Sequence, residues 1–191
     1  MLMFVGEAVN CQILVWKEQK NPCYGKSCDD SCQQRKLKMT EPIRNFHEVE
    51  PYLFRGGQPV KEGFYALKDL GVKTVVCLRW GKKVIAAEKA SVESLGMTFV
   101  SMPLNYWNLP KQETVDHFLK LIDDESNHPL FVHCFHGSDR TGILIAIFRM
   151  LRQGWTFHDS YREMVKFGFH RFRLQNFKWW LRKYTRKAGF E

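Results

Sequence analysis

The stretch that decides the fold runs from residue 129 to residue 142 and reads PLFVHCFHGSDRTG. Its apolar opening predicts a buried strand, its polar middle predicts a tight loop, and the apolar run ILIAIF at 143–148 predicts a helix. Cys134 would then lie at the mouth of the loop, with Arg140 at the start of the helix. Backbone N–H groups at a helix start lack partners within the helix and carry partial positive charge. Such a place binds phosphate and lowers the pKa of a thiol.

The same stretch resembles the signature of a known family. The pattern His-Cys-x5-Arg-Thr-Gly at residues 133–142 is similar to that of the cysteine-dependent protein tyrosine and dual-specificity phosphatase superfamily. Residues 45–59, NFHEVEPYLFRGGQP, resemble the opening of the small bacterial dual-specificity type, and residues 167–170 resemble its C-terminal part. Tyrosine-phosphatase-like phytases share this chemistry. The resemblance covers residues 42–187.

The resemblance implies a role for each residue of the signature. Cys134 would attack phosphorus, and the phosphocysteine intermediate would then be hydrolysed. Arg140 would hold two phosphate oxygens with its planar guanidinium. His133 and Thr141 would tune the thiolate, Thr141 through a hydrogen bond to the sulfur. The backbone amides of the loop would complete the phosphate cradle, and they belong to Phe135, His136, Gly137, Ser138, Asp139 and Arg140. The resemblance implies no cofactor and no metal.

The proton donor is where the chain departs from the family pattern. Family members usually carry an aspartate on a separate loop well before the cysteine, whereas the corresponding stretch here, MPLNYWNLP at 102–110, holds no carboxylate. Its Asn105 and Asn108 cannot deliver a proton. Asp139 is therefore the expected general acid and later base, in a position similar to that of an aspartate in the myotubularin-type lipid phosphatases. The alternative is a carboxylate that braces the loop by pairing Arg140 or a neighbouring amide.

Strands and helices alternate along the rest of the chain. Strands are expected at 72–78, 97–104 and 130–133, and helices at 61–70, 82–95, 113–122, 141–153, 157–166 and 172–187. This order predicts an α/β fold, a single domain with a central, mostly parallel sheet flanked by helices on both faces. Residues 42–191 would form this dual-specificity phosphatase-like catalytic domain. Tyr106, Trp107 and Trp155 are candidates for the wall of its pocket.

Residues 1–41 form a distinct N-terminal extension in this interpretation. Four of the six cysteines lie there, namely Cys11, Cys23, Cys28 and Cys32. They would form two disulfides in an oxidising compartment and remain free thiols in a reducing cytosol. Residues 1–16 make a poor signal peptide and are too short to span a membrane. The localisation is therefore open between the cytoplasm and a secreted or periplasmic location.

The net charge of +9 is concentrated near the C-terminus. Residues 152–191 hold ten lysines and arginines against three acidic residues. These cations form a solvated face, an electrostatic funnel for anionic substrates, or a site for an anionic membrane surface. No nucleic-acid motif is present, so no nucleic-acid partner is expected.

Two functions remain open from the sequence. The first is a phosphomonoesterase that hydrolyses phosphotyrosine, in proteins, and/or inositol polyphosphates. The high positive charge and the missing loop aspartate favour the inositol phosphates, whereas the absence of lysine from the loop residues 135–139 does not. The second is a pseudophosphatase that binds phosphorylated ligands without turnover.

Overall fold

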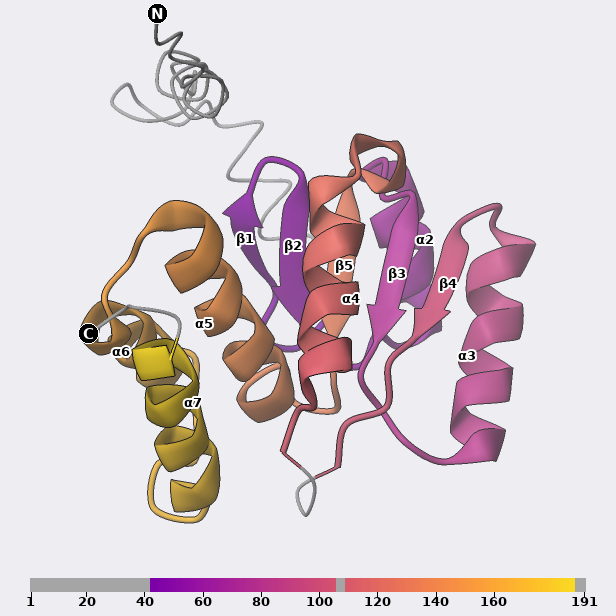
Figure 1. Ribbon diagram of the computed structural model, residues 1–191. Helices are drawn as coiled ribbons and strands as arrows, with labels where there is room; N and C mark the ends of the chain where they lie inside the picture. Colours follow the sequence, from indigo (N-terminus) through magenta and orange to yellow (C-terminus); the bar gives the residue numbers. More distant parts are fainter. Residues whose placement is uncertain (1–41, 106–108, 188–191) are drawn as a thin grey trace, which may run out of the picture. The chain divides into compact units, whose positions relative to one another are not determined.

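A five-stranded sheet forms the centre of the molecule (Figure 1). The computed structural model describes residues 42–105 and 109–187. The strands lie in the order β1-β2-β5-β3-β4. β1 pairs antiparallel with β2, and every other neighbouring pair is parallel. The strands are β1 (His47–Glu50), β2 (Leu53–Gly56), β3 (Thr74–Cys77), β4 (Thr98–Ser101) and β5 (Leu130–His133).

Helices cover both faces of the sheet (Figure 1). One face packs against α2 (Lys61–Asp69) and α3 (Lys82–Ser94). The other face carries the larger core, to which four helices contribute, with the last two packed against α5; they are α4 (Gln112–Asp123), α5 (Asp139–Gln153), α6 (Phe157–Lys166) and α7 (Gln175–Lys187). A short 3-10 helix, η2 (Glu125–Asn127), follows α4. No helix in the described ranges is long and apolar enough to cross a membrane.

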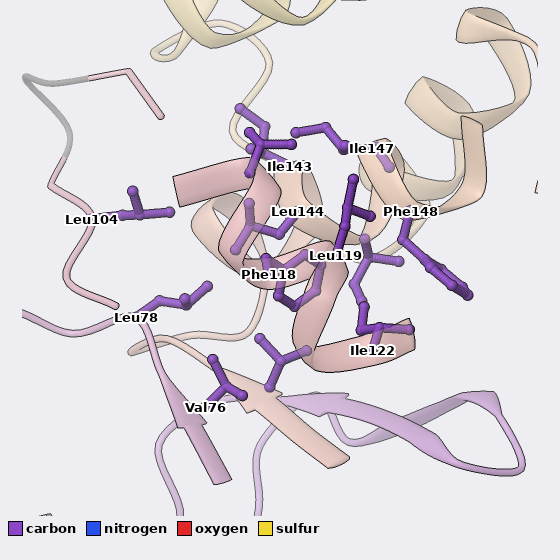
Figure 2. Close-up of a cluster of buried hydrophobic side chains, with 14 of the residues drawn as sticks. Val76, Leu78, Leu104, Phe118, Leu119, Ile122, Ile143, Leu144, Ile147 and Phe148 are labelled. Carbon is purple, nitrogen blue, oxygen red and sulfur yellow. The ribbon is translucent and has the colours of Figure 1, made fainter. Parts of the chain in front are cut away.

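The two cores follow from the alternation of side chains along the strands. Successive strand residues point to opposite faces, so Val75 and Phe131 pack towards α2 and α3. Val76 and Val132 pack towards α4 and α5. Figure 2 shows Val76 lying beneath the cluster that α4 and α5 contribute. The buried positions on α4 and α5 in that view are Phe118, Leu119, Ile122, Ile143, Leu144, Ile147 and Phe148.

The predicted fold class is confirmed, and the main differences lie at the ends of elements. β5 and α6 have the predicted bounds. α5 begins at Asp139 rather than Thr141, so the helix already includes part of the signature. α7 begins at Gln175 rather than at residue 172, because residues 171–173 form a turn. The strand predicted at 97–104 is shorter and ends at Ser101, although the Met102 and Leu104 N–H groups still donate to the Cys77 and Leu78 carbonyls. The predicted extension 1–41 lies outside the described residues.

The parallel strands bring the site together at one edge of the sheet. The carboxyl ends of β2, β5 and β3 are neighbours, since β5 lies between the other two strands. The loop after β5 contains Cys134, and it therefore meets the residues that follow β2 and β3. This edge is where ligands bind in open parallel sheets.

Candidate active site

The signature loop connects the end of β5 to the start of α5. Cys134 is buried, and the Gly137 backbone N–H donates a hydrogen bond to its sulfur at 3.3 Å. Gly137 has a φ of +74°, a conformation that residues with a side chain rarely adopt. The loop leads directly into α5, a helix of fifteen residues, so the sulfur lies close to the positive end of a helix dipole.

The turn after β2 packs tightly against the signature loop. The Gln58 N–H donates to the Phe135 carbonyl at 3.1 Å. A Cβ on Gly137 would lie 2.4 Å from the Gly56 carbonyl carbon, closer than real atoms approach. The run RGGQP at residues 55–59 therefore provides a backbone wall for the loop.

Arg140 lies in the first turn of α5 and is almost fully buried. Its Nη1 donates to the carbonyl oxygens of Leu78 at 3.3 Å and Leu104 at 3.2 Å. These residues follow β3 and β4, so the guanidinium is held at the carboxyl edge of the sheet beside the loop. Because the side chain is already held in one conformation, it loses little further conformational freedom when it binds an anion.

A buried ion pair lies beneath the loop on the side of α2 and α3. His133 Nε2 is 2.5 Å from Glu88 Oε1, and His133 Nδ1 donates to the Cys134 carbonyl at 3.1 Å. Gln58 Nε2 and the Cys77 thiol donate to Glu88 Oε2 at 3.0 and 3.4 Å. Burial raises the pKa of Glu88, but the hydrogen bond and charge of His133, helped by the other donors, bring it below its usual value. Burial and the nearby Glu88 raise the pKa of Cys77 to about 12.

Asp139 is also buried, at 2% exposure. Its carboxylate accepts the His170 backbone N–H at 2.9 Å, and the His170 ring Nδ1 lies 2.9 and 3.0 Å from its two oxygens. These contacts tie the loop to the turn that precedes α7. They match the bracing alternative, with the neighbouring amide supplied by His170 rather than by the loop itself. The acid role of Asp139 stays a prediction.

The hydrogen bond expected from Thr141 to the sulfur does not form. Thr141 Oγ1 and Ser138 Oγ are buried and have no hydrogen-bond partner within the described residues. The sulfur accepts a hydrogen bond from the Gly137 N–H instead. Gly137 has a positive φ, and in this backbone conformation its N–H points towards the sulfur.

The aromatic and histidine candidates lie in different places. Phe135 is 47% exposed, and the Arg79 guanidinium lies 4.9 Å from its ring centre. Burial, and next the charge of Arg44, lower the pKa of His136, so its ring is mainly neutral near neutral pH. Trp155 follows the opposite end of α5, which places it away from the loop. Tyr106 and Trp107 are outside the described residues.

Sequence reasoning missed two residues of the site, Arg55 and Glu88. Arg55 Nη2 donates to the Gly137 carbonyl at 2.8 Å, and Glu88 pairs with His133. Arg55 carried a signal, since a charge inside a short apolar strand before a Gly-Gly turn is unusual. Glu88 carried none, because α3 also holds exposed acidic and basic residues.

Comparison with protein families and solved structures agrees with this geometry. Residues 33–178 match the model of a family described as DSP-PTPase phosphatase fused to NAD+ kinase. A putative tyrosine-protein phosphatase, OCA1 of Meyerozyma guilliermondii, is 32% identical over 146 residues, which cover 71% of this chain and 77% of OCA1. The dual specificity protein phosphatase TpbA of Pseudomonas aeruginosa is 29% identical over 129 residues, 68% of this chain and 57% of TpbA.

Solved structures show the same fold. A crystal structure of P. aeruginosa TpbA has a TM-score of 0.63 at 24% identity, covering 85% of this chain and 91% of that chain. The catalytic domain of the PP-IP phosphatase SIW14 from S. cerevisiae has a TM-score of 0.58 at 24% identity, covering 68% of this chain and 79% of that chain. The family match over most of the described residues and the 32% identity to OCA1 place the chain in the dual-specificity phosphatase family of cysteine-dependent tyrosine phosphatases.

Proposed function

We propose that this chain is a cysteine-dependent phosphomonoesterase that hydrolyses phosphotyrosine and/or inositol polyphosphates through a phosphocysteine intermediate. The observation that carries the proposal is the loop geometry. The Gly137 amide donates to the Cys134 sulfur, and Arg140 is anchored beside it at the start of α5. A nucleophile, a fixed cation and helix-terminal amides at one place suit phosphoryl transfer.

The reaction would proceed in two steps. In the first, the Cys134 thiolate attacks phosphorus, a sulfur–phosphorus bond forms, and the bond to the leaving oxygen breaks. Arg140 and the loop amides of residues 135–140 hold the equatorial phosphate oxygens during this transfer. In the second, water attacks the phosphocysteine, which releases inorganic phosphate and regenerates the thiolate.

The leaving oxygen needs a proton, and Asp139 is our proposed donor. It lies directly before Arg140, and the described residues 102–105 and 109–110 contain no carboxylate. The His170 ring that contacts Asp139 is about half exposed, so the Asp139–His170 pair has a connection to solvent through which a proton can be replaced. In the second step the same carboxylate would take a proton from the attacking water.

The names of the relatives support a phosphorylated substrate of either kind. TpbA is named a dual specificity protein phosphatase, and a relative from Arabidopsis thaliana, 30% identical over 131 residues, is named inositol diphosphatase DSP3. The net charge of +9 favours the more anionic inositol phosphates. We expect no nucleic-acid partner, and an anionic membrane surface stays open as a second partner.

The test is phosphate release by the wild-type protein and by Cys134→Ser, offering a phosphotyrosine peptide and inositol hexakisphosphate in parallel. Cys77→Ser is the matched control, because Cys77 is a second buried cysteine that lies in β3, outside the loop. We expect release by the wild type and by Cys77→Ser, and none by Cys134→Ser. Release that survives in Cys134→Ser would contradict the cysteine mechanism.

A pseudophosphatase is the second candidate, and the contacts of Asp139 favour it. If the hydrogen bonds from His170 made Asp139 a brace alone, the described part of the site would lack an obvious acid. Wild-type protein that binds the phosphotyrosine peptide in calorimetry but releases no phosphate from either substrate would support this function over hydrolysis.

A further inference from the structure

A second arginine lies beneath the signature loop. Arg55, the third residue of β2, is 1% exposed, and its Nη2 donates to the Gly137 carbonyl at 2.8 Å. Carbonyl and N–H groups point in opposite directions across a planar trans peptide. With the Gly137 carbonyl drawn towards Arg55, the N–H of Ser138 in the same peptide faces the other way. Arg55 therefore fixes the orientation of one of the amides expected to bind phosphate.

Arg55 is also a buried cation that has no salt bridge in the described part of the chain. Its Nε and Nη1 have no hydrogen-bond partner among those residues, and its guanidinium stacks 4.5 Å from the Phe167 ring centre. Burial lowers the pKa of Arg55 to about 10, so it stays charged at neutral pH. An uncompensated buried charge is costly. An anion in the adjacent loop would offset that cost.

The charged groups that face Arg55 come from several elements. They are Glu163 on α6, Arg149 on α5, His47 on β1 and Cys134 in the loop. Of these, only Glu163 and the thiolate of Cys134 attract the guanidinium. Glu163 already pairs with Arg149 at 3.0 Å, so much of its charge is compensated there. The thiolate and the bound phosphate are the anions left for Arg55.

We propose that Arg55 is a positioning residue of the phosphate site, which orients the Gly137–Ser138 peptide and stabilises negative charge on Cys134 and on the bound phosphate. The inference rests on the proposed function, in that Cys134 is taken as the nucleophile. It concerns a residue that acts from behind the loop, in contrast to Arg140, which acts from within it.

The test measures the reactivity of Cys134 without any substrate. The rate of its alkylation by iodoacetamide is followed between about pH 5 and 9 by mass spectrometry of its peptide, in wild type, Arg55→Met and Arg55→Lys. With Arg55→Met, we expect the midpoint of the profile to move upward and alkylation near pH 6 to slow about tenfold, the effect of losing one nearby cation. Arg55→Lys keeps the charge and should recover most of that rate.

Arg149→Met is the matched control. Arg149 is a buried arginine on the same side of the sheet, but it is paired with Glu50 at 2.9 Å and with Glu163. Its loss should lower the melting temperature and move the Cys134 profile much less than Arg55→Met does, because it only frees Glu163 to face Arg55. Turnover separates the two roles of Arg55, which are to orient the peptide and to supply positive charge. Arg55→Lys keeps the charge but loses the peptide contact, so it should lower kcat by a larger factor than it slows alkylation.

Two results would overturn the inference. One is an unchanged alkylation profile in folded Arg55→Met, and the other is an equal shift in Arg149→Met. Arg55→Lys keeps the test decisive if Arg55→Met does not fold, because wild-type kcat in the lysine variant would also contradict a positioning role. Alkylation requires no phosphatase activity, so a wild type without turnover would defeat the proposed function and leave this test standing.

Discussion

At the scale of single residues, the chemistry of the site depends on charged pairs that each join a residue of the signature to a residue outside it. Glu88 and His133 form such a pair beneath the loop, and the His133 ring holds the Cys134 carbonyl. Asp139 and His170 form another at its edge. The loop is thus supported from two sides, by the buried Glu88–His133 pair and by the Asp139–His170 pair, whose imidazole is about half exposed.

Glu88→Gln should be strongly destabilising, because it leaves His133 without its buried carboxylate. We expect a loss of about 3 kcal/mol in the free energy of unfolding near pH 7, as is usual when one partner of a buried pair is removed. The folded state lowers the pKa of Glu88 from its usual 4.5. Its contribution is therefore complete above that value and is lost as the pH falls below it.

Urea denaturation at neutral pH and below pH 4.5 measures both effects. Glu93→Gln on the same helix is the control, because that carboxylate is half exposed and pairs with the exposed Lys89. A gap between wild type and Glu88→Gln that stays constant from neutral to acid pH would contradict the assignment.

Asp139→Asn separates the acid role from the bracing role. Loss of a general acid slows the transfer by about 10²–10⁴-fold, and the loss is greatest for a leaving group that needs the proton. We expect the variant to hydrolyse an alkyl phosphate far more slowly than wild type but to retain more of its rate on p-nitrophenyl phosphate. An equal loss on both substrates, together with a lower melting temperature, would identify Asp139 as a brace. Full turnover at every pH would exclude the acid role.

At the scale of elements, the unit of β5, loop and α5 works because the turn after β2 fits against it. Gly137 is the contact point, with a positive φ and no room for a Cβ beside Gly56. We expect Gly137→Ala to abolish turnover and to cost more stability than Gly154→Ala. Gly154 has a similar φ of +69° at the end of α5 but nothing within 4 Å of a Cβ.

Gly154→Ala thus measures the conformational strain alone, about 1 kcal/mol. The difference between the two variants in thermal unfolding measures the clash with Gly56. Equal losses in both, with turnover intact in Gly137→Ala, would show that the close approach does not determine the loop.

The elements also show which parts of the site the sequence could predict. β5, the loop and α5 are contiguous in the chain. The apolar pattern of this stretch therefore predicted the positions of Cys134 in the loop and Arg140 at the start of the helix. Arg55 and Glu88 precede Cys134 in other elements, and only the strand order β2-β5-β3 brings them beneath the loop. Pairing of that kind leaves no local pattern in the chain. The predicted hydrogen bond from Thr141 to the Cys134 sulfur was wrong for a related reason. The path of the loop backbone decides which donor reaches the sulfur, and that path cannot be read from the sequence.

At the scale of the whole molecule, the positive charge begins at the site itself. The His170 contact with Asp139 places the turn before α7 beside the loop, and that turn continues with the exposed Arg171 and Arg173. Further exposed cations follow along α7, among them Arg182 and Lys183. The basic segment is therefore continuous with the edge of the candidate active site, as an electrostatic funnel requires.

Removing charge at the two ends of this segment should affect substrate capture differently. Arg171→Ala combined with Arg173→Ala should raise KM for inositol hexakisphosphate several-fold at low salt and leave kcat nearly unchanged, because these cations attract the substrate without touching phosphorus. Arg182→Ala combined with Lys183→Ala should have a smaller effect, since charges more than about 10 Å away are screened near 0.1 M salt. Both effects should shrink as salt approaches about 1 M, where the screening length is about 3 Å. Steady-state kinetics over this range of salt distinguishes a funnel from a solvated face, for which neither pair of substitutions would change KM at any salt concentration.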